Sequence, residues 1–161
     1  PRMTVLGIHT RRSIPSYNPA LEPIAGTMPY ISIFRLEVRS YELDVYNHVN
    51  NAVYVNWLEH GRCKMLQDKG LDYTRIIDNW GVRYMTVRTE IDYRSPLHLG
   101  DSVEVATQLE RVGNTSVTLS QRIAKTAASD PAAEARVVIV FTDATSGKPT
   151  KVPTEFVRQF A

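Results

Sequence analysis

Four polar residues, Asp44, His48, Asn50 and Asn51, lie in one turn-prone segment that runs directly into a long helical pattern. Asn is a preferred N-cap, and a helix N-terminus carries roughly half a positive charge together with unpaired N–H donors. A carboxylate close to such a helix start suits acyl transfer, because the free N–H groups can stabilise a developing oxyanion. The segment therefore has an acyl-transfer arrangement in outline.

A helix is predicted over residues 51–69, directly after these polar residues. Its apolar and interior positions fall on two faces, one with Tyr54, Trp57, Leu58, Gly61 and Met65 and the other with Val55, Arg62 and Leu66. Because this surface is wide, the helix must be covered on more than one side, and we expect a partner subunit to cover part of it. Gly61 costs roughly 1 kcal/mol relative to Ala, which indicates a close approach of another backbone.

Strands are predicted on both sides of this helix. Residues 31–39 alternate between apolar and charged side chains, and four further strand-like segments cover residues 82–94, 102–112, 115–126 and 134–143. Gly113-Asn114 predicts a tight hairpin, whereas residues 71–80 show no regular period. One strand, one long helix and four strands joined by short turns predict an α+β protein with an antiparallel five-stranded sheet.

Length and composition indicate one ordinary globular domain. We predict it over residues 31–161, after a proline-rich N-terminal extension of residues 1–30. The net charge is only +2, so a nucleic-acid partner is not expected. No apolar run approaches the ~18 residues of a membrane span, and the N-terminal residues lack the apolar region of a secretory signal. Together with a single cysteine, these features favour a cytoplasmic location and no membrane partner.

No motif of another common chemistry competes with the carboxylate. The sequence contains no G-x-S-x-G, G-x-x-x-x-G-K-[ST], H-E-x-x-H or G-x-G-x-x-G motif. Cys63 is the only cysteine, which excludes an intramolecular disulfide and a cysteine-based metal site. We expect Cys63 to be a small buried residue of the helix, and no metal site is predicted.

A longer set of residues matches one enzyme family in order. It comprises Val38-Arg39, Tyr41, Leu43-Asp44-Val45-Tyr46, His48-Val49-Asn50-Asn51-Ala52, Tyr54, Leu58-Glu59, Arg62, Ile91-Asp92-Tyr93-Arg94, Pro96 and Gly100-Asp101. On these residues the sequence resembles the hotdog-fold thioesterases of the 4-hydroxybenzoyl-CoA thioesterase family, most closely the long-chain acyl-CoA thioesterase branch. The resemblance implies a sheet wrapped around one long central helix. Asn47 stands where many members have Gly.

The resemblance also implies roles for particular residues. Asp44 is expected to attack the thioester or to activate water, while the backbone N–H of Asn51 polarises the carbonyl. His48 is expected to support the loop, and Tyr54 and Trp57 to contact the acyl group. The substrate is expected to be a fatty acyl-CoA, so that coenzyme A arrives with the substrate and no cofactor is bound. Active sites in this family lie between the subunits of a homodimer, which often pairs again into a homotetramer.

Several alternatives stay open at this point. Asp44 can also be an ordinary turn aspartate, and Glu59 is the second candidate carboxylate because another branch of hotdog thioesterases places its carboxylate on the helix. Its spacing to Arg62 suits an ion pair. The substrate can be an acyl group on acyl carrier protein or an aromatic acyl-CoA. A non-catalytic module that binds acyl-CoA is the alternative outside enzymes.

Overall fold

The computed structural model describes residues 30–160, so the extension predicted for residues 1–30 lies almost entirely outside the described residues. The elements are β1 (Ile31–Glu37), the 3-10 helix η1 (Ser40–Glu42), α1 (Asn51–Gln67), α2 (Tyr73–Trp80), β2 (Val82–Tyr93), β3 (Ser102–Val112), β4 (Ser116–Lys125), β5 (Ala133–Asp143) and α3 (Thr154–Phe160). The predicted strands agree with β1 to β5 to within a few residues. The predicted helix corresponds to α1, which has 17 residues.

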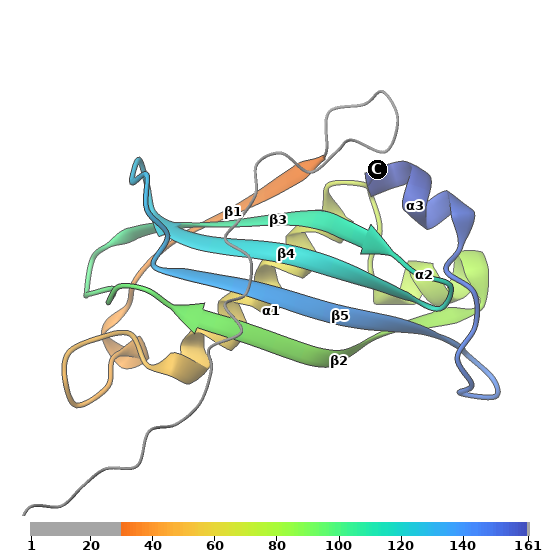
Figure 1. The fold of residues 1–161 in the computed structure, drawn as a ribbon, viewed down its shortest axis with the longest axis horizontal. Coiled ribbons are helices and arrows are strands. Elements are labelled where there is room, and N and C mark those ends of the chain that lie inside the picture. The colour runs from red at the N-terminus through yellow and green to blue at the C-terminus, as the bar shows by residue number, and fades with distance from the viewer. Residues whose placement is uncertain (1–29, 161) are drawn as a thin grey trace, which may run out of the picture.

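The five strands form one sheet in the order β1-β3-β4-β5-β2, and every neighbouring pair is antiparallel. Figure 1 shows α1 behind this sheet, with the loop before α1 at one end of the molecule and α2 and α3 at the other. At the predicted hairpin, the N–H of Gly113 donates to the carbonyl of Ser116 at 2.7 Å. The α+β class and the antiparallel five-stranded sheet are thus confirmed.

Alternation along the strands produces the core. In β4, Val117, Leu119 and Ile123 are buried, while the residues between them are mostly half-buried or exposed. In a strand successive side chains point to opposite faces, so one face of the sheet packs against α1. The helix contributes Leu58, Met65 and five other buried residues to the core.

The helix leaves less apolar surface for a partner subunit than its two apolar faces predicted. On the second face, Arg62 and Leu66 are both buried within this chain. Of that face, Val55 is the exposed member, with 43% of its surface accessible. Both apolar faces of the helix are therefore covered by its own chain, except at Val55.

Arg62 is the principal polar residue of this interface and is only 3% exposed. Its Nη1 donates to Oε1 of Gln121 at 3.0 Å, and its Nη2 forms an ion pair with Glu59. The amide of Gln121 in turn donates to the carbonyl of Leu58 at 2.9 Å and to Oγ1 of Thr107 at 2.8 Å. Buried charges need such partners, so this network fixes α1 to β3 and β4.

Gly61 lies at the closest approach between α1 and the sheet. A Cβ built there would lie 2.9 Å from Oγ1 of Thr107, 2.9 Å from Cγ1 of Val105 and 3.1 Å from Nε2 of Gln121. The expectation of a close neighbour is therefore confirmed, but the neighbours are side chains of β3 and β4 and not another backbone. The glycine sets the distance between helix and sheet.

Two short helices, α2 and α3, were not predicted. Asp72 caps α2 by accepting from the N–H of Arg75 at 2.8 Å, and Gly81 ends it with φ of 64°. In α3, Phe156 and Phe160 are buried and their ring centroids are 4.8 Å apart. These helices close the end of the core that lies opposite the loop of Asp44, as Figure 1 shows.

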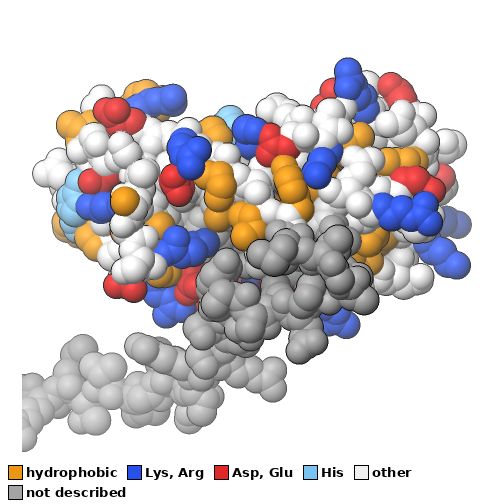
Figure 2. Space-filling view, turned by 90° about the horizontal axis from the view of Figure 1, so that it is seen from above, with side chains coloured by type: hydrophobic (Ala, Val, Ile, Leu, Met, Phe, Trp, Pro, Cys, Tyr) orange, Lys and Arg blue, Asp and Glu red, His pale blue; other side chains and the backbone are white. Residues whose placement is uncertain are grey.

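Charged side chains of both signs share the surface. On the face that Figure 2 shows, Lys and Arg lie among Asp and Glu and do not gather in one patch. Several form cross-strand pairs, such as Arg35 with Glu104 at 2.7 Å. Exposed pairs of this kind contribute roughly 0–1 kcal/mol each. Within residues 30–160, no helix is long and apolar enough to cross a membrane.

The close approach at Gly61 predicts the sign of a stability change. Helix propensity alone would make Gly61→Ala stabilising by roughly 1 kcal/mol. We expect the opposite, a loss of about 1–3 kcal/mol in the free energy of unfolding, because the new methyl group must displace buried side chains of β3 and β4. Urea unfolding measures this change in free energy. The control is Asn56→Ala, at an exposed position of the same helix. A gain in stability for Gly61→Ala would contradict this account.

Candidate active site

The loop that carries Asp44 is a tight hairpin between η1 and α1. Leu43 and Val49 face each other as an isolated antiparallel bridge, and the N–H of Asp44 donates to the carbonyl of His48 at 2.8 Å. Asn47 has φ of 59°, in the left-handed region that Asn tolerates better than most residues. Local hydrogen bonds and one left-handed residue therefore close the loop at Asp44.

The carboxylate of Asp44 has two unequal oxygens. Oδ1 accepts from the N–H of Tyr46 at 2.8 Å and from the N–H of His48 at 3.2 Å. In the part of the chain that the structure describes, no hydrogen bond reaches Oδ2, and the residue is half-buried. One oxygen thus fixes the side chain, while the other remains available to a substrate or to water.

The start of α1 is capped in a way that leaves one N–H free. Asn50 is the N-cap, and its Oδ1 accepts from the N–H of Ala52 at 2.9 Å. The backbone N–H of Asn50 donates to the carbonyl of Glu42 at 2.9 Å. By contrast, no acceptor among residues 30–160 meets the N–H of Asn51. This donor lies at the positive end of the helix dipole and is suited to bind an oxyanion.

Asp44 and the start of α1 line the same open cleft, which has a volume of about 380 Å³. The remaining wall comes from the end of β2 and the segment after it. The lining residues are Asp44, His48, Val49, Asn51, Tyr54, Tyr93, Arg94, Ser95 and Pro96. The structure therefore brings together four residues that the sequence singled out, namely Asp44, His48, Asn51 and Tyr54.

Two tyrosines form the aromatic wall of this cleft. Tyr54 is buried, and its ring is edge-on to the ring of Tyr93 with centroids 5.1 Å apart. Burial raises the pKa of Tyr54 to about 12, so its hydroxyl is neutral at physiological pH. The hydroxyl of Tyr93 donates to the carbonyl of Asn51 at 3.1 Å. Aromatic surface thus lies directly beside the free N–H.

Trp57 does not line this cleft. It lines a second cavity of about 550 Å³ between β1 and α1, together with Phe34, Leu36 and Val53. Its Nε1 donates to Oε1 of the buried Glu42 at 3.1 Å. Of the two aromatic residues that the sequence singled out for substrate contact, only Tyr54 is therefore adjacent to Asp44.

His48 lines the cleft, and its ring is edge-on to His98 with centroids 5.0 Å apart. Asp101 accepts from the backbone N–H of His98 at 2.8 Å and from Nζ of Lys125 at 2.9 Å. Partial burial opposes ionisation of Asp101, but these contacts outweigh it and lower its pKa. The supporting role expected for His48 stays a prediction.

Glu59, the second candidate carboxylate, is occupied by other groups. It forms the ion pair with Arg62 and accepts from the hydroxyl of Tyr73 at 2.7 Å. Burial, followed by this hydrogen bond, raises the pKa of Tyr73. Sγ of Cys63, which is partly buried, lies 4.0 Å from Glu59. Glu59 thus links α1 to the start of α2, and it does not line the cleft of Asp44.

Two residues in or beside the site were not assigned a role from the sequence. Tyr93 is the penultimate residue of the strand predicted over residues 82–94, and its alternation with Ile91 gives no sign that its hydroxyl reaches α1. Glu42 lies three residues after Arg39, whose N–H donates to Oε2 of Glu42 at 2.8 Å. That spacing is a recognisable local signal for a carboxylate that accepts from a backbone N–H. Among residues 30–160, no three His, Cys, Asp or Glu side chains are placed to hold a metal ion.

Comparison with known proteins agrees with this geometry. Residues 38–160 match the family model described as the thioesterase-like superfamily. The chain is 33% identical to the long-chain acyl-CoA thioesterase FadM of Escherichia coli K12 over 68% of this chain and 81% of that protein. It is 32% identical to the chloroplastic acyl-acyl carrier protein thioesterase ATL2 of Arabidopsis thaliana over 74% of this chain, which spans 62% of that protein's length.

A solved structure gives the same result for the fold. The probable thioesterase YbaW of Escherichia coli superposes with a TM-score of 0.71 at 30% identity, covering 80% of this chain and 95% of that one. This likeness confirms the hotdog fold that the resemblance implied. The chain belongs to the thioesterase-like superfamily and is a thioester hydrolase, as the sequence predicted.

Proposed function

We propose that this protein hydrolyses fatty acyl-CoA thioesters to the free acid and coenzyme A. The observation that carries the proposal is that Asp44, whose Oδ2 accepts no hydrogen bond from residues 30–160, and Asn51, whose N–H meets no acceptor there, line the same cleft. A carboxylate and an oxyanion donor are the two groups that thioester hydrolysis requires. The likeness to an E. coli enzyme named for long-chain acyl-CoA supports the substrate class.

The N–H of Asn51 is proposed to stabilise the oxyanion. When the thioester carbonyl becomes tetrahedral, its oxygen gains negative charge, and the free N–H of Asn51, a residue of the cleft wall, can donate to it. Removing one such donor from an enzyme typically costs ~10²–10³-fold in rate. Only the backbone of Asn51 takes part, so its side chain is replaceable.

Two roles for Asp44 fit this arrangement. As a general base, Oδ2 takes a proton from water, the water oxygen attacks the carbonyl carbon, and the C–S bond then breaks to release the thiolate, which is protonated. As a nucleophile, Oδ2 attacks the carbonyl carbon itself, the thiolate leaves, and water hydrolyses the mixed anhydride. The donor at Asn51 serves both routes, and neither needs a bound cofactor.

An acyl carrier protein is the alternative carrier, favoured by the 32% identity to the chloroplastic acyl-acyl carrier protein thioesterase. Such a carrier is acidic, and its docking requires complementary basic side chains around the cleft. Of the Lys and Arg residues in the described part of the chain, Arg94 lines the cleft. It is already paired with Asp92 at 3.2 Å and Glu134 at 3.1 Å. The described cleft lining thus gives an acidic carrier protein no cluster of basic side chains on which to dock.

The first test compares two turn aspartates in a thiol-release assay. We expect Asp44→Asn to lower kcat by at least about 10²-fold, because the amide keeps the Oδ1 hydrogen bonds but cannot act as a base or nucleophile. Asp143→Asn is the matched control. Oδ1 of Asp143 likewise accepts from two backbone N–H groups, those of Thr145 at 3.2 Å and Ser146 at 2.7 Å. Asp143 lies at the opposite end of β2 from Tyr93.

The assay uses short, medium and long acyl-CoAs, an aromatic acyl-CoA and an acyl-acyl carrier protein. Full activity of a folded Asp44→Asn variant would show that Asp44 is not the catalytic carboxylate. Glu59→Gln would then be the next variant to test. Faster turnover of the carrier-protein substrate would favour the alternative. Binding of acyl-CoA without thiol release by the unmodified protein would indicate a non-catalytic module.

We also propose that two copies associate along β2. This is an edge strand of 12 residues, and its exposed side chains include Met85 at 50% and Val87 at 60% accessibility. An unpaired apolar edge is a template for another strand. Because Tyr93 ends the same strand, a second copy there adjoins the cleft. The tetramer that the resemblance implies stays a prediction.

A charge on that edge tests the dimer. We expect Val87→Asp to shift the protein from dimer to monomer, because a second copy paired along β2 would partly desolvate the new carboxylate, which is unfavourable. Light scattering after size-exclusion chromatography measures the mass. Leu99→Asp, at another exposed apolar residue in the turn before β3, is the control and should remain dimeric. An unchanged mass for Val87→Asp would show that β2 is not the interface.

A further inference from the structure

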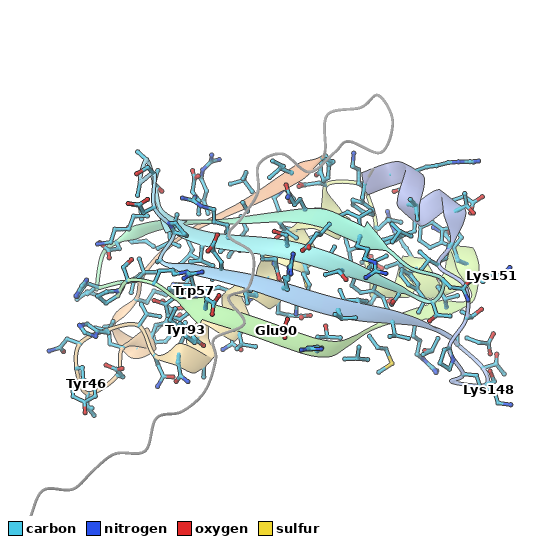
Figure 3. All side chains as sticks on the ribbon, viewed as in Figure 1. Tyr46, Trp57, Glu90, Tyr93, Lys148 and Lys151 are labelled. Carbon is cyan, nitrogen blue, oxygen red and sulfur yellow. The ribbon has the colours of Figure 1, made fainter. Side chains whose placement is uncertain are left out.

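Tyr93 connects the sheet to the first residue of α1. It is the last residue of β2, and its hydroxyl donates to the carbonyl of Asn51 at 3.1 Å, across 42 positions of sequence. Its ring is edge-on to that of Tyr54 and lines the cleft. Figure 3 labels Tyr93 at the end of β2 that lies beside the start of α1. The same residue, Asn51, thus carries the contact to Tyr93 and the free N–H.

The start of a helix needs such contacts because its first turn has few intrahelical hydrogen bonds and frays easily. Two anchors at this end are local: the N–H of Ala52 donates to the side chain of Asn50, and the N–H of Asn50 donates to Glu42. Both come from the segment that directly precedes the helix, η1 and the loop after it. Tyr93 is the anchor that comes from the sheet, and it ties the helix start to the opposite wall of the cleft.

We propose that Tyr93 is a positioning residue that holds Asn51, and with it the oxyanion donor, in register with the cleft. This inference rests on the proposed function, because the donor matters only if a thioester carbonyl is polarised there. The hydroxyl of Tyr93 acts through the backbone of Asn51 and takes no proton from the reacting atoms. Rigid support of this kind is required because a misplacement of ~1 Å can cost about 10²-fold in rate.

The electrostatics of Tyr93 agree with a permanent donor. The residue is 49% exposed, and the burial of the rest raises the pKa of its hydroxyl above the usual value. The hydroxyl therefore remains protonated at neutral pH and keeps its hydrogen for the carbonyl of Asn51. An acid that exchanged its proton with the substrate in each turnover would need a pKa near the working pH.

Tyr93→Phe tests the proposal, because it removes the hydroxyl and keeps the ring against Tyr54. We expect kcat for acyl-CoA hydrolysis to fall about 10-fold, less than the loss of the donor itself, with KM within about two-fold. Hydrogen exchange of the amides of Ala52 and Val53 should become faster. Tyr41→Phe is the matched control, since the hydroxyl of Tyr41 also makes one side-chain hydrogen bond, accepted from Nη1 of Arg39 at 2.7 Å, and Tyr41 does not line the cleft.

The outcomes separate this proposal from the proposed function. If Tyr93→Phe keeps its kcat while Asp44→Asn is inactive, the reaction stands and the role of Tyr93 is overturned. If Tyr93→Phe only lowers the unfolding temperature, with kcat unchanged well below that temperature, the hydroxyl is merely structural and the proposal is again overturned. If the unmodified protein releases no thiol from any acyl-CoA, the proposed function itself fails, and the inference fails with it.

Discussion

The contact between Gly61 and the sheet is the constraint on which the site depends. Because Thr107, Val105 and Gln121 come within van der Waals distance of a missing Cβ, the helix has one closest position against β3 and β4. The side chain of Gln121 also holds the helix to the sheet by donating a hydrogen bond to the carbonyl of Leu58. An α-helix rises ~1.5 Å per residue, so the ten residues back to Asn51 span about 15 Å. Fixing the middle of α1 therefore sets where its first N–H lies.

The two candidate catalytic carboxylates near this helix, Asp44 and Glu59, have opposite environments. Asp44 is oriented by backbone N–H groups through one oxygen only, whereas Glu59 is engaged by Arg62 and Tyr73. A carboxylate shared between a buried guanidinium and a phenol is a structural link between elements. A carboxylate held by a hairpin beside a helix start retains a free oxygen for chemistry. The different roles of the two residues follow from their burial and their hydrogen-bond partners, because both side chains are carboxylates.

Most features that the sequence predicted correctly depend on residues that are close to one another in the chain. Turn residues and alternation located all five strands, and Asp44 and the cap at Asn50 could be recognised because their partners lie within a few residues. The missed features depend on distant partners: Arg62 meets Gln121 across 59 positions, and Tyr93 meets Asn51 across 42. No periodicity encodes such pairs. The helix α2 is different, since its capping residues, Asp72 and Gly81, were visible in the sequence but the segment is short.

The two free edges of the sheet are unequal, and this has a consequence for polymerisation. The strand β1 has only seven residues and exposes the charged Arg35 and Glu37 beside Ile31, whereas β2 has 12 residues and exposes Met85 and Val87 between Arg83 and Arg88. Short, charged edges resist strand addition, and long apolar ones favour it. A chain that is adhesive at both edges could add copies without end and form fibres. In the dimer proposed along β2, pairing would use up the apolar edge of each copy, so the assembly would close after one step.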